Sequence, residues 1–141
     1  MGPQNNFAVI AQARAKERGM RMGAATAVAG IGVALTGNVW PVVWLAAVAL
    51  AQFPDAFAFA PFARDPDRRP TRREKLICAA AAGLSTTIYS TISTFLWFNG
   101  GPAAQVVATI LLGASLMHVA MHLHYDRLIL GVTIAPFMAH W

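Results

Sequence analysis

Long apolar stretches alternate with short polar ones along this chain, and the apolar stretches have the length of membrane-spanning helices. Asp55 is the only charged residue between positions 23 and 63, and none lies in 76–125 or in 128–141. A helix needs about 20 apolar residues to cross a hydrocarbon core of about 30 Å, so the block 76–125 suits two spans. The pattern predicts an all-α, polytopic membrane helix bundle with about five transmembrane helical runs.

Turn residues and charges divide the chain into segments. Gly37-Asn38 and the run from Asn99 to Pro102 predict turns between spans. We expect a basic tail (1–22), transmembrane helices 1 and 2 (23–61), a basic loop (62–75), helices 3 and 4 (76–124), and a corner with the start of helix 5 (125–141). The alternative for 23–61 is one span followed by a Phe-rich segment at the membrane interface. It would put the tail and the basic loop on opposite sides of the membrane. In the tail, we expect Phe7, Ile10 and Ala11 to form one face of a short helix on the membrane surface.

Positive charge is confined to the polar segments. All 11 Lys and Arg fall in the tail, the basic loop or the Asp126–Arg127 corner, and the predicted turns carry none. Because cytoplasmic loops are enriched in Lys and Arg, we place the amino terminus, the basic loop and the corner in the cytoplasm. Anionic headgroups are expected near the loop arginines, which are Arg64, Arg68, Arg69, Arg72 and Arg73. The charge does not indicate nucleic-acid binding, since no binding motif accompanies it.

The histidines are the first candidates for chemistry. His118 and His122 are four residues apart and share a helix face, a spacing with which imidazoles can hold a metal or haem. They have no carboxylate or cysteine partner in the motif, and no second liganding helix is evident. His124 is expected at the water interface and His140 near the opposite side. A structural role is favoured over metal, haem or pH sensing, so we predict no metal, no cofactor and no catalytic residue.

The predicted third span is rich in hydroxyl groups. They belong to Ser85, Thr86, Thr87, Tyr89, Ser90, Thr91, Ser93 and Thr94. They either line a small pocket or act as contacts between helices, and the second interpretation is favoured because hydroxyls bond to neighbours or to their own helix. The small residues of the first span likewise predict close packing, namely Gly23, Ala27, Gly30, Ala34 and Gly37. Trp40 and Trp44 are expected at the outer interface.

The order of these segments resembles the N-terminal membrane region of alphaproteobacterial hybrid sensor histidine kinases. The likeness is strongest over residues 95–136, in W-F-N-G-G-P, in L-L-G-A-S-L-M-H-V and in the A-P of Ala135-Pro136. The resemblance implies a bacterial inner-membrane protein, with a homodimer among its expected assemblies, whose spans anchor a cytoplasmic kinase core. None of that core lies in these residues, so no catalytic residue is carried over.

Two other classes stay open, a small transporter or channel subunit that uses the hydroxyl groups and a membrane haem or metal protein that uses His118 and His122. The last apolar run, 128–141, has 14 residues. At 1.5 Å per residue such a helix reaches about 21 Å, short of a core of about 30 Å. We therefore expect this chain to be the front part of a longer polypeptide.

Overall fold

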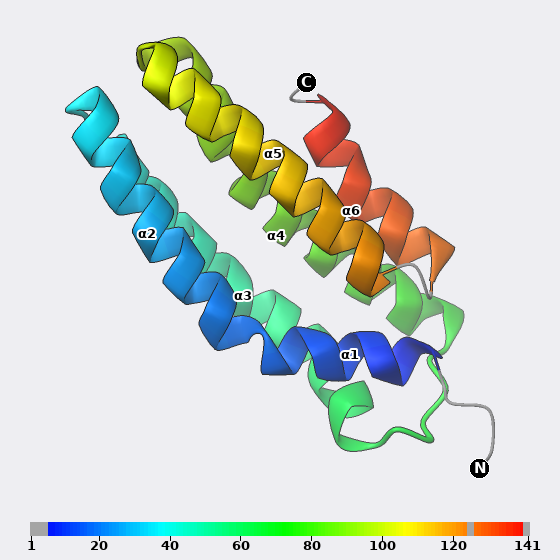
Figure 1. The fold of residues 1–141 in the computed structure, drawn as a ribbon. Helices are drawn as coiled ribbons and strands as arrows, with labels where there is room; N and C mark the ends of the chain where they lie inside the picture. The colour runs from blue at the N-terminus through cyan, green and yellow to red at the C-terminus, as the bar shows by residue number, and fades with distance from the viewer. Residues whose placement is uncertain (1–5, 124–125, 140–141) are drawn as a thin grey trace.

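The all-α prediction is confirmed by the computed structural model, which describes residues 6–123 and 126–139. Within those ranges the chain forms six α-helices and no strand (Figure 1). They are α1 (Asn6–Lys16), α2 (Arg18–Thr36), α3 (Trp40–Arg64), α4 (Arg72–Asn99), α5 (Pro102–Leu123) and α6 (Arg127–Ala139).

Local signals in the sequence set several helix ends. Gly37 ends α2 with φ of 64°, a left-handed conformation that glycine adopts without strain. The α4 helix begins with a capping box, in which the Thr71 hydroxyl accepts from the Glu74 amide and the Glu74 carboxylate accepts from the Thr71 amide. Pro41 stands in the first turn of α3, where its missing N–H costs nothing.

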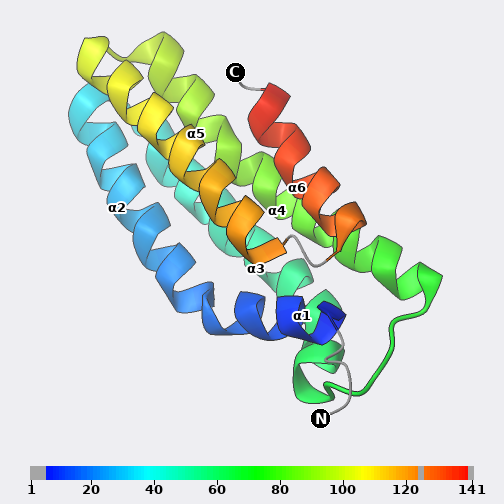
Figure 2. The same cartoon turned by 45° about the vertical axis from the view of Figure 1, so that its right-hand side comes forward.

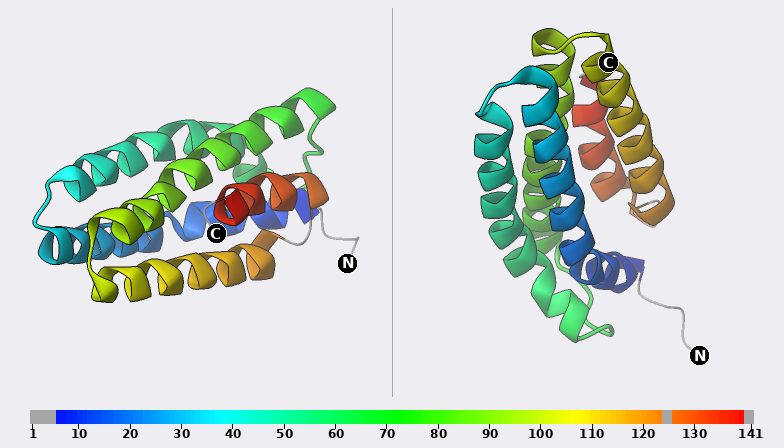
Figure 3. Two further views of the ribbon diagram at one scale, coloured as in Figure 1. Left: turned by 90° about the horizontal axis from the view of Figure 1, so that it is seen from above. Right: turned by 60° about the vertical axis from the view of Figure 1, so that its left-hand side comes forward.

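The α4 helix is the centre of the bundle, because it packs against α3, α5 and α6 (Figure 2). The α2 and α3 helices form an antiparallel pair beside it, and α5 lies on the other side of α4. The short helix α1 runs across one end of the bundle, where it packs against α3 (Figure 3).

In the part of the chain that the structure describes, four helices are long and apolar enough to cross a membrane, namely α2, α3, α4 and α5 over residues 102–121. Large apolar side chains on their outer surfaces remain exposed, among them Leu50, Phe53 and Phe57 of α3 and Ile110 of α5. Such extensive exposure suits lipid better than water, and we describe the chain as a membrane protein. The α6 helix is apolar but has only 13 residues.

The charged segments gather at one end of the bundle. The α1 helix, the basic loop and the start of α6 lie there, and the turns after α2 and α4 lie at the other end (Figure 1). Lys75 Nζ lies 3.0 Å from Asp126 Oδ2 and so ties the start of α4 to the start of α6. The predicted separation of basic segments from uncharged turns is therefore present in the fold.

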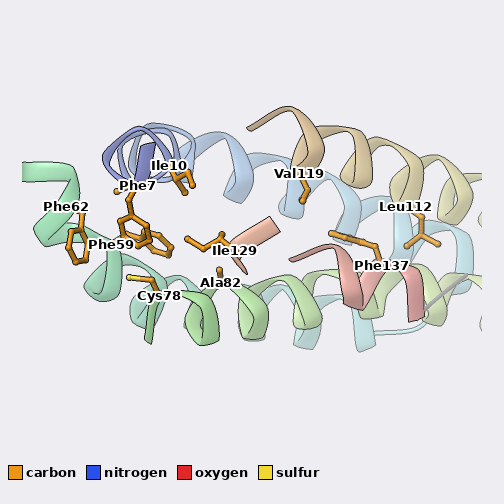
Figure 4. Close-up of a cluster of buried hydrophobic side chains, with 11 residues drawn as sticks. Phe7, Ile10, Phe59, Phe62, Cys78, Ala82, Leu112, Val119, Ile129 and Phe137 are labelled. Atoms are coloured by element: carbon orange, nitrogen blue, oxygen red, sulfur yellow. The ribbon is translucent and has the colours of Figure 1, made fainter. Parts of the chain in front are cut away.

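Two apolar clusters fill the interior. The first joins α1, α3, α4, α5 and α6 around Phe7, Ile10, Phe59 and Phe62 (Figure 4). The second fills the half of the bundle far from α1 and includes Trp44, Ile92 and Leu96.

The tail differs from the sequence prediction in its position. Phe7, Ile10 and Ala11 do form one face of a helix, but that face is buried inside the protein instead of resting on lipid. The Phe7 ring stacks on Phe59 at 5.9 Å between centroids and meets Phe62 edge-on at 5.0 Å. The next helix begins at Arg18, not at Gly23, so the end of the expected tail belongs to the first long helix.

Two further packing predictions were wrong. Trp44 is 2% exposed and donates from Nε1 to the Ile88 carbonyl at 2.8 Å, so it lies between α3 and α4 and not at an interface. The small residues expected to pack in the first span point outward, and a Cβ added at Gly23 or Gly30 would meet nothing within 4 Å. The packed face of α2 instead includes Gly32, where an added Cβ would lie 3.0 Å from Pro41 Cγ.

Candidate functional site: a cavity beside a buried arginine–aspartate cluster

Three charged residues from three helices meet inside the protein near α1. Arg14 of α1 donates from Nε and Nη2 to the carboxylate of Asp55 in α3, with a shortest distance of 2.6 Å. Arg21 of α2 places Nη2 at 3.7 Å from Asp55 Oδ2. Asp55 is 2% exposed and Arg14 8% exposed, so the carboxylate is almost fully removed from solvent. We call Arg14, Arg21 and Asp55 the charged triad.

The bend between α1 and α2 brings the two arginines together. Arg21 Nη2 donates to the Arg14 carbonyl oxygen at 2.7 Å and so satisfies a backbone acceptor at the end of α1. The Arg14 guanidinium also lies over the Phe59 ring, 5.0 Å from its centroid. The triad thereby holds α1, α2 and α3 in one arrangement.

A cavity of about 400 Å³ adjoins the triad. All six helices contribute to its lining, which is formed by Ala13, Arg14, Glu17, Met20, Arg21, Ala24, Val28, Gln52, Ser85, Thr86, Tyr89, Leu111, Ala114, Ser115, His118, Val119 and Phe137. Most of its exposed surface is apolar, and the polar groups come mainly from the α1–α2 bend and from α4. Its size falls within the range of about 300–1,000 Å³ that is typical of small-molecule sites.

Two buried polar atoms of residues in this lining have no hydrogen-bond partner among the described residues. They are Nε of Arg21, a donor, and Oε1 of Gln52, an acceptor. Gln52 is 7% exposed. Leaving a buried polar atom unpaired costs about 1–3 kcal/mol, and more for a charged group. Less than 1 Å² of either atom is accessible, so neither atom faces the cavity and the cost falls on the packing around the charged triad.

The charges of the wall are partly balanced. Two arginines share the single carboxylate of Asp55, so the charged triad has one net positive charge. Glu17 adds a negative charge, and its Oε2 lies 3.2 Å from His118 Nε2.

The structure places some of the predicted candidates at this cavity. His118 lines it and contacts Glu17, a partner that the sequence motif did not reveal. The side chain of His122 and the whole of His124 and His140 lie outside the described residues. In the described part of the chain, no group of three or more His, Cys, Asp or Glu side chains is placed to hold a metal ion. The absence of a metal or haem stays a prediction.

Both interpretations of the hydroxyl-rich span find support. Ser90 and Ser93 are buried, as expected for contacts between helices, and the Ser90 hydroxyl donates to the Thr87 carbonyl of its own helix. Ser85, Thr86 and Tyr89 line the cavity, as expected for a pocket. On α4, the surface that packs against other helices therefore adjoins the surface that lines the cavity.

The charged triad and Gln52 were not among the residues predicted from the sequence. Asp55 carried a usable signal, since it is the only acid within an apolar stretch of 41 residues from 23 to 63, and acids in such stretches are rare and often functional. The sequence does not show which residues Asp55 contacts. Arg14 and Arg21 looked like ordinary tail charges, and nothing in their spacing connects them with a residue on α3.

In comparisons with protein-family models, curated proteins and solved structures, nothing matches this chain.

Proposed function

We propose that this protein is the membrane-embedded input module of a signalling protein, in which the cavity receives a small molecule and α1 transmits its presence. One observation carries the proposal: Arg14 and Arg21 line the cavity and at the same time hold α1 against the bundle. A ligand that contacts either arginine changes the charge balance around Asp55. The position of α1 would then depend on whether the cavity is occupied.

The physical basis is that a ligand shifts a conformational equilibrium only by binding its two states differently. The docked state of α1 presents both arginines at the cavity wall, and a released α1 would withdraw Arg14 from it. The amphipathic face of α1 has an alternative partner when released, because Phe7 and Ile10 can rest on a membrane surface. The docked and released positions of α1 would thus differ in their affinity for a ligand. Moving from one to the other would cost little apolar burial, because Phe7 and Ile10 leave the bundle for the membrane surface.

A transporter or channel is less well supported by this geometry. The half of the bundle far from α1 is filled by Trp44, Ile92, Leu96 and their neighbours. The cavity residues on α2 and α3 stop at Val28 and Gln52, short of the turn between these helices. A path across the bundle would require this apolar cluster to separate.

The orientation and the effector are part of the same proposal. The basic end would face the cytoplasm of a bacterial inner membrane, with Arg64 and Arg69 near anionic headgroups, and the chain would act as a homodimer. The resemblance to sensor histidine kinases suggests a cytoplasmic kinase core as the effector. If the source DNA encodes a kinase core in frame after Trp141, that supports this part, and a stop codon would contradict it.

Cysteine labelling tests the orientation. Single cysteines at Arg69 and Gly101 would be introduced into a Cys78→Ala background and treated with a membrane-impermeant maleimide on intact cells; Gly101 is exposed, and a Cβ added there would meet nothing within 4 Å. Position 101 should react from outside, and position 69 should react only after the cells are opened. External labelling at position 69 would refute the topology.

Filling the cavity tests the coupling itself. Ala114→Phe adds a ring at the cavity wall, and Ala120→Phe adds the same ring at an exposed position of α5 outside the cavity. Hydrogen–deuterium exchange of α1 should change in the first variant and stay at the wild-type rate in the second. An α1 that exchanges identically in both variants would contradict the input-module proposal.

A further inference from the structure

Three hydroxyl groups of the cavity lining make no hydrogen bond to the described residues. They belong to Ser85 and Tyr89 of α4 and to Ser115 of α5. None of their oxygens is among the inaccessible side-chain atoms that lack a partner, so all three oxygens keep accessible surface. Ser85 and Tyr89 are four residues apart and therefore share one face of α4. The cavity wall thus offers uncharged hydrogen-bonding groups from two helices.

The Tyr89 hydroxyl has the greatest need of an outside acceptor. Its ring is half-buried and lies 5.6 Å from the Trp44 ring between centroids, and Trp44 is itself fixed by its bond to the Ile88 carbonyl. A serine hydroxyl in a helix can turn back to a carbonyl of its own helix. The phenol stands at the far end of a rigid ring and lacks this option. An acceptor oxygen that enters the cavity would satisfy it.

The cavity opens between α2 and α5, which are neighbours on one side of the bundle (Figure 1). Its exposed lining residues lie on these two helices: Met20, which is 63% exposed, and Ala24 belong to α2, and Ala114 belongs to α5. Both helices are long and apolar enough to span a membrane. The opening therefore faces acyl chains, and a ligand that enters there must first dissolve in the bilayer.

The charges beside the cavity favour an uncharged ligand. Arg14 and Arg21 supply two positive charges, and Asp55 and Glu17 supply two negative ones. With His118 neutral, these charges cancel. A charged ligand would give up its hydration without a free counter-charge in the wall, which is costly.

We propose that the cavity binds a neutral lipophilic molecule with a hydrogen-bond acceptor oxygen, which enters from the bilayer between α2 and α5 and accepts from the Tyr89 hydroxyl. This assignment rests on the proposed function and names the ligand class of the same site. The apolar part of the ligand would contact Val28, Leu111 and Phe137, which line the same cavity. Ser85 and Ser115 would provide further hydrogen bonds to the oxygen.

Photolabelling of the full chain in phosphatidylcholine nanodiscs tests this assignment. The probe is radiolabelled benzophenone, a neutral aromatic ketone, and saturable label is expected on segments 20–28 and 111–119. Unlabelled competitors share one ring system: fluorenone, fluorene without the oxygen, fluorenone-2-carboxylate and a trimethylammonium derivative of fluorenone. Their concentrations are compared as mole fractions in the bilayer, so differences in partitioning do not enter. Label that fails to saturate, or that falls on other segments, would overturn the proposal.

The competitors separate the acceptor from the charge. Fluorenone should compete about two- to tenfold better than fluorene, the effect of one net hydrogen bond between neutral groups. Both charged derivatives should compete less well than fluorenone. Equal competition by fluorene would refute the acceptor contact. Stronger competition by the carboxylate or by the trimethylammonium derivative would refute the neutral ligand class.

Variants assign the contact to Tyr89. Tyr89→Phe keeps the ring and should reduce competition by fluorenone to the level of fluorene, while competition by fluorene stays unchanged. Ser90→Ala is the control, because it removes a hydroxyl of the same helix that lies outside the cavity lining and donates to the Thr87 carbonyl. An equal effect of Tyr89→Phe on fluorenone and fluorene would contradict the hydroxyl contact.

Ala114→Phe keeps the assignment testable if Tyr89→Phe does not fold, since it narrows the cavity from α5. It should reduce the saturable label, whereas Ala120→Phe, outside the cavity, should not; equal labelling of the two variants would overturn the proposal. The outcomes also separate this inference from the input module. Saturable binding that leaves α1 exchange unchanged would refute the module alone. An α1 that responds to Ala114→Phe without any saturable label would refute the ligand class alone.

Discussion

The charged triad leads to a quantitative prediction for Asp55→Asn. The substitution preserves the shape of the side chain and removes the carboxylate that pairs with Arg14, which is 8% exposed and paired at 2.6 Å. Removing one partner of a buried ion pair costs about 3–5 kcal/mol, because the remaining charge stays buried. The asparagine oxygen can still accept one hydrogen bond, so we expect the lower value, about 3 kcal/mol.

The protein can avoid this cost by releasing α1. Docking of α1 buries Phe7 and Ile10, each worth about 1.5–3 kcal/mol, but on a membrane surface the same residues can rest on lipid. Release of α1 then costs less than unfolding of the bundle. In Asp55→Asn, we therefore expect α1 to open and the central helix α4 to keep its structure.

Hydrogen–deuterium exchange in nanodiscs measures both helices in one experiment. A change of about 3 kcal/mol corresponds to a roughly hundredfold loss of protection in α1, and α4 serves as the internal reference. Asp67→Asn is the control, because Asp67 is an acid in the exposed basic loop. If α1 of Asp55→Asn exchanges as slowly as in the wild type, the triad does not hold this helix. If α4 loses protection in parallel, α1 does not open separately.

Three further predictions concern the packing of the bundle. Gly83→Ala should destabilise the contact of α4 with α6 by about 1–3 kcal/mol, because the new Cβ would lie 2.6 Å from Val132 Cγ1. Gly30→Ala, with nothing within 4 Å, should be neutral or stabilising in the same thermal unfolding assay. Trp44→Phe should lower stability by about 1–3 kcal/mol, since the bond to Ile88 is lost inside the bundle, and an unchanged unfolding curve would refute that. Burial favours the neutral form of Asp126, but hydrogen bonds from Lys75 and from the amides of residues 129 and 128 outweigh it and hold the pKa below its ordinary value of 3.8. Because this pKa is depressed on folding, Asp126 stabilises α6 above pH 3.8, and this stabilisation is lost as the pH falls through the lower pKa of the folded state. Hydrogen–deuterium exchange of α6 should accelerate in that pH range in the wild type. It should not accelerate in Asp126→Asn.

Much of the secondary structure could be read from the sequence. The uncharged stretches, the glycine at position 37 and the turn from Asn99 to Pro102 placed the long helices close to where they lie. These signals are local: a helix end depends on a few neighbouring residues, and the length of an apolar stretch is visible without knowing its partners. The gathering of the basic segments at one end also follows from the order of the segments along the chain.

The sequence did not show which face of each helix is buried. The α3 helix is apolar on nearly every side, so periodicity cannot distinguish the face with Trp44, which packs on α4, from the face with Phe53, which is exposed. The stripe of Gly23 and Gly30 looked suited to packing and faces outward, because α2 contacts α3 through Gly32 and Pro41. Small residues permit close approach, but the neighbouring helix decides where it occurs.

The candidate site was decided by tertiary structure alone. Arg14 and Asp55 are 41 residues apart in the chain, and only the path of α1 across the end of the bundle brings them together. Asp55 was visible in the sequence as an isolated acid, but its charge balance and its burial depend on two arginines from other helices. Likewise, only the packing of α3 against its neighbours places Gln52 at the cavity wall. The sequence determined the length and the ends of the long helices, and the packing of α1 and α2 against α3 determined the site.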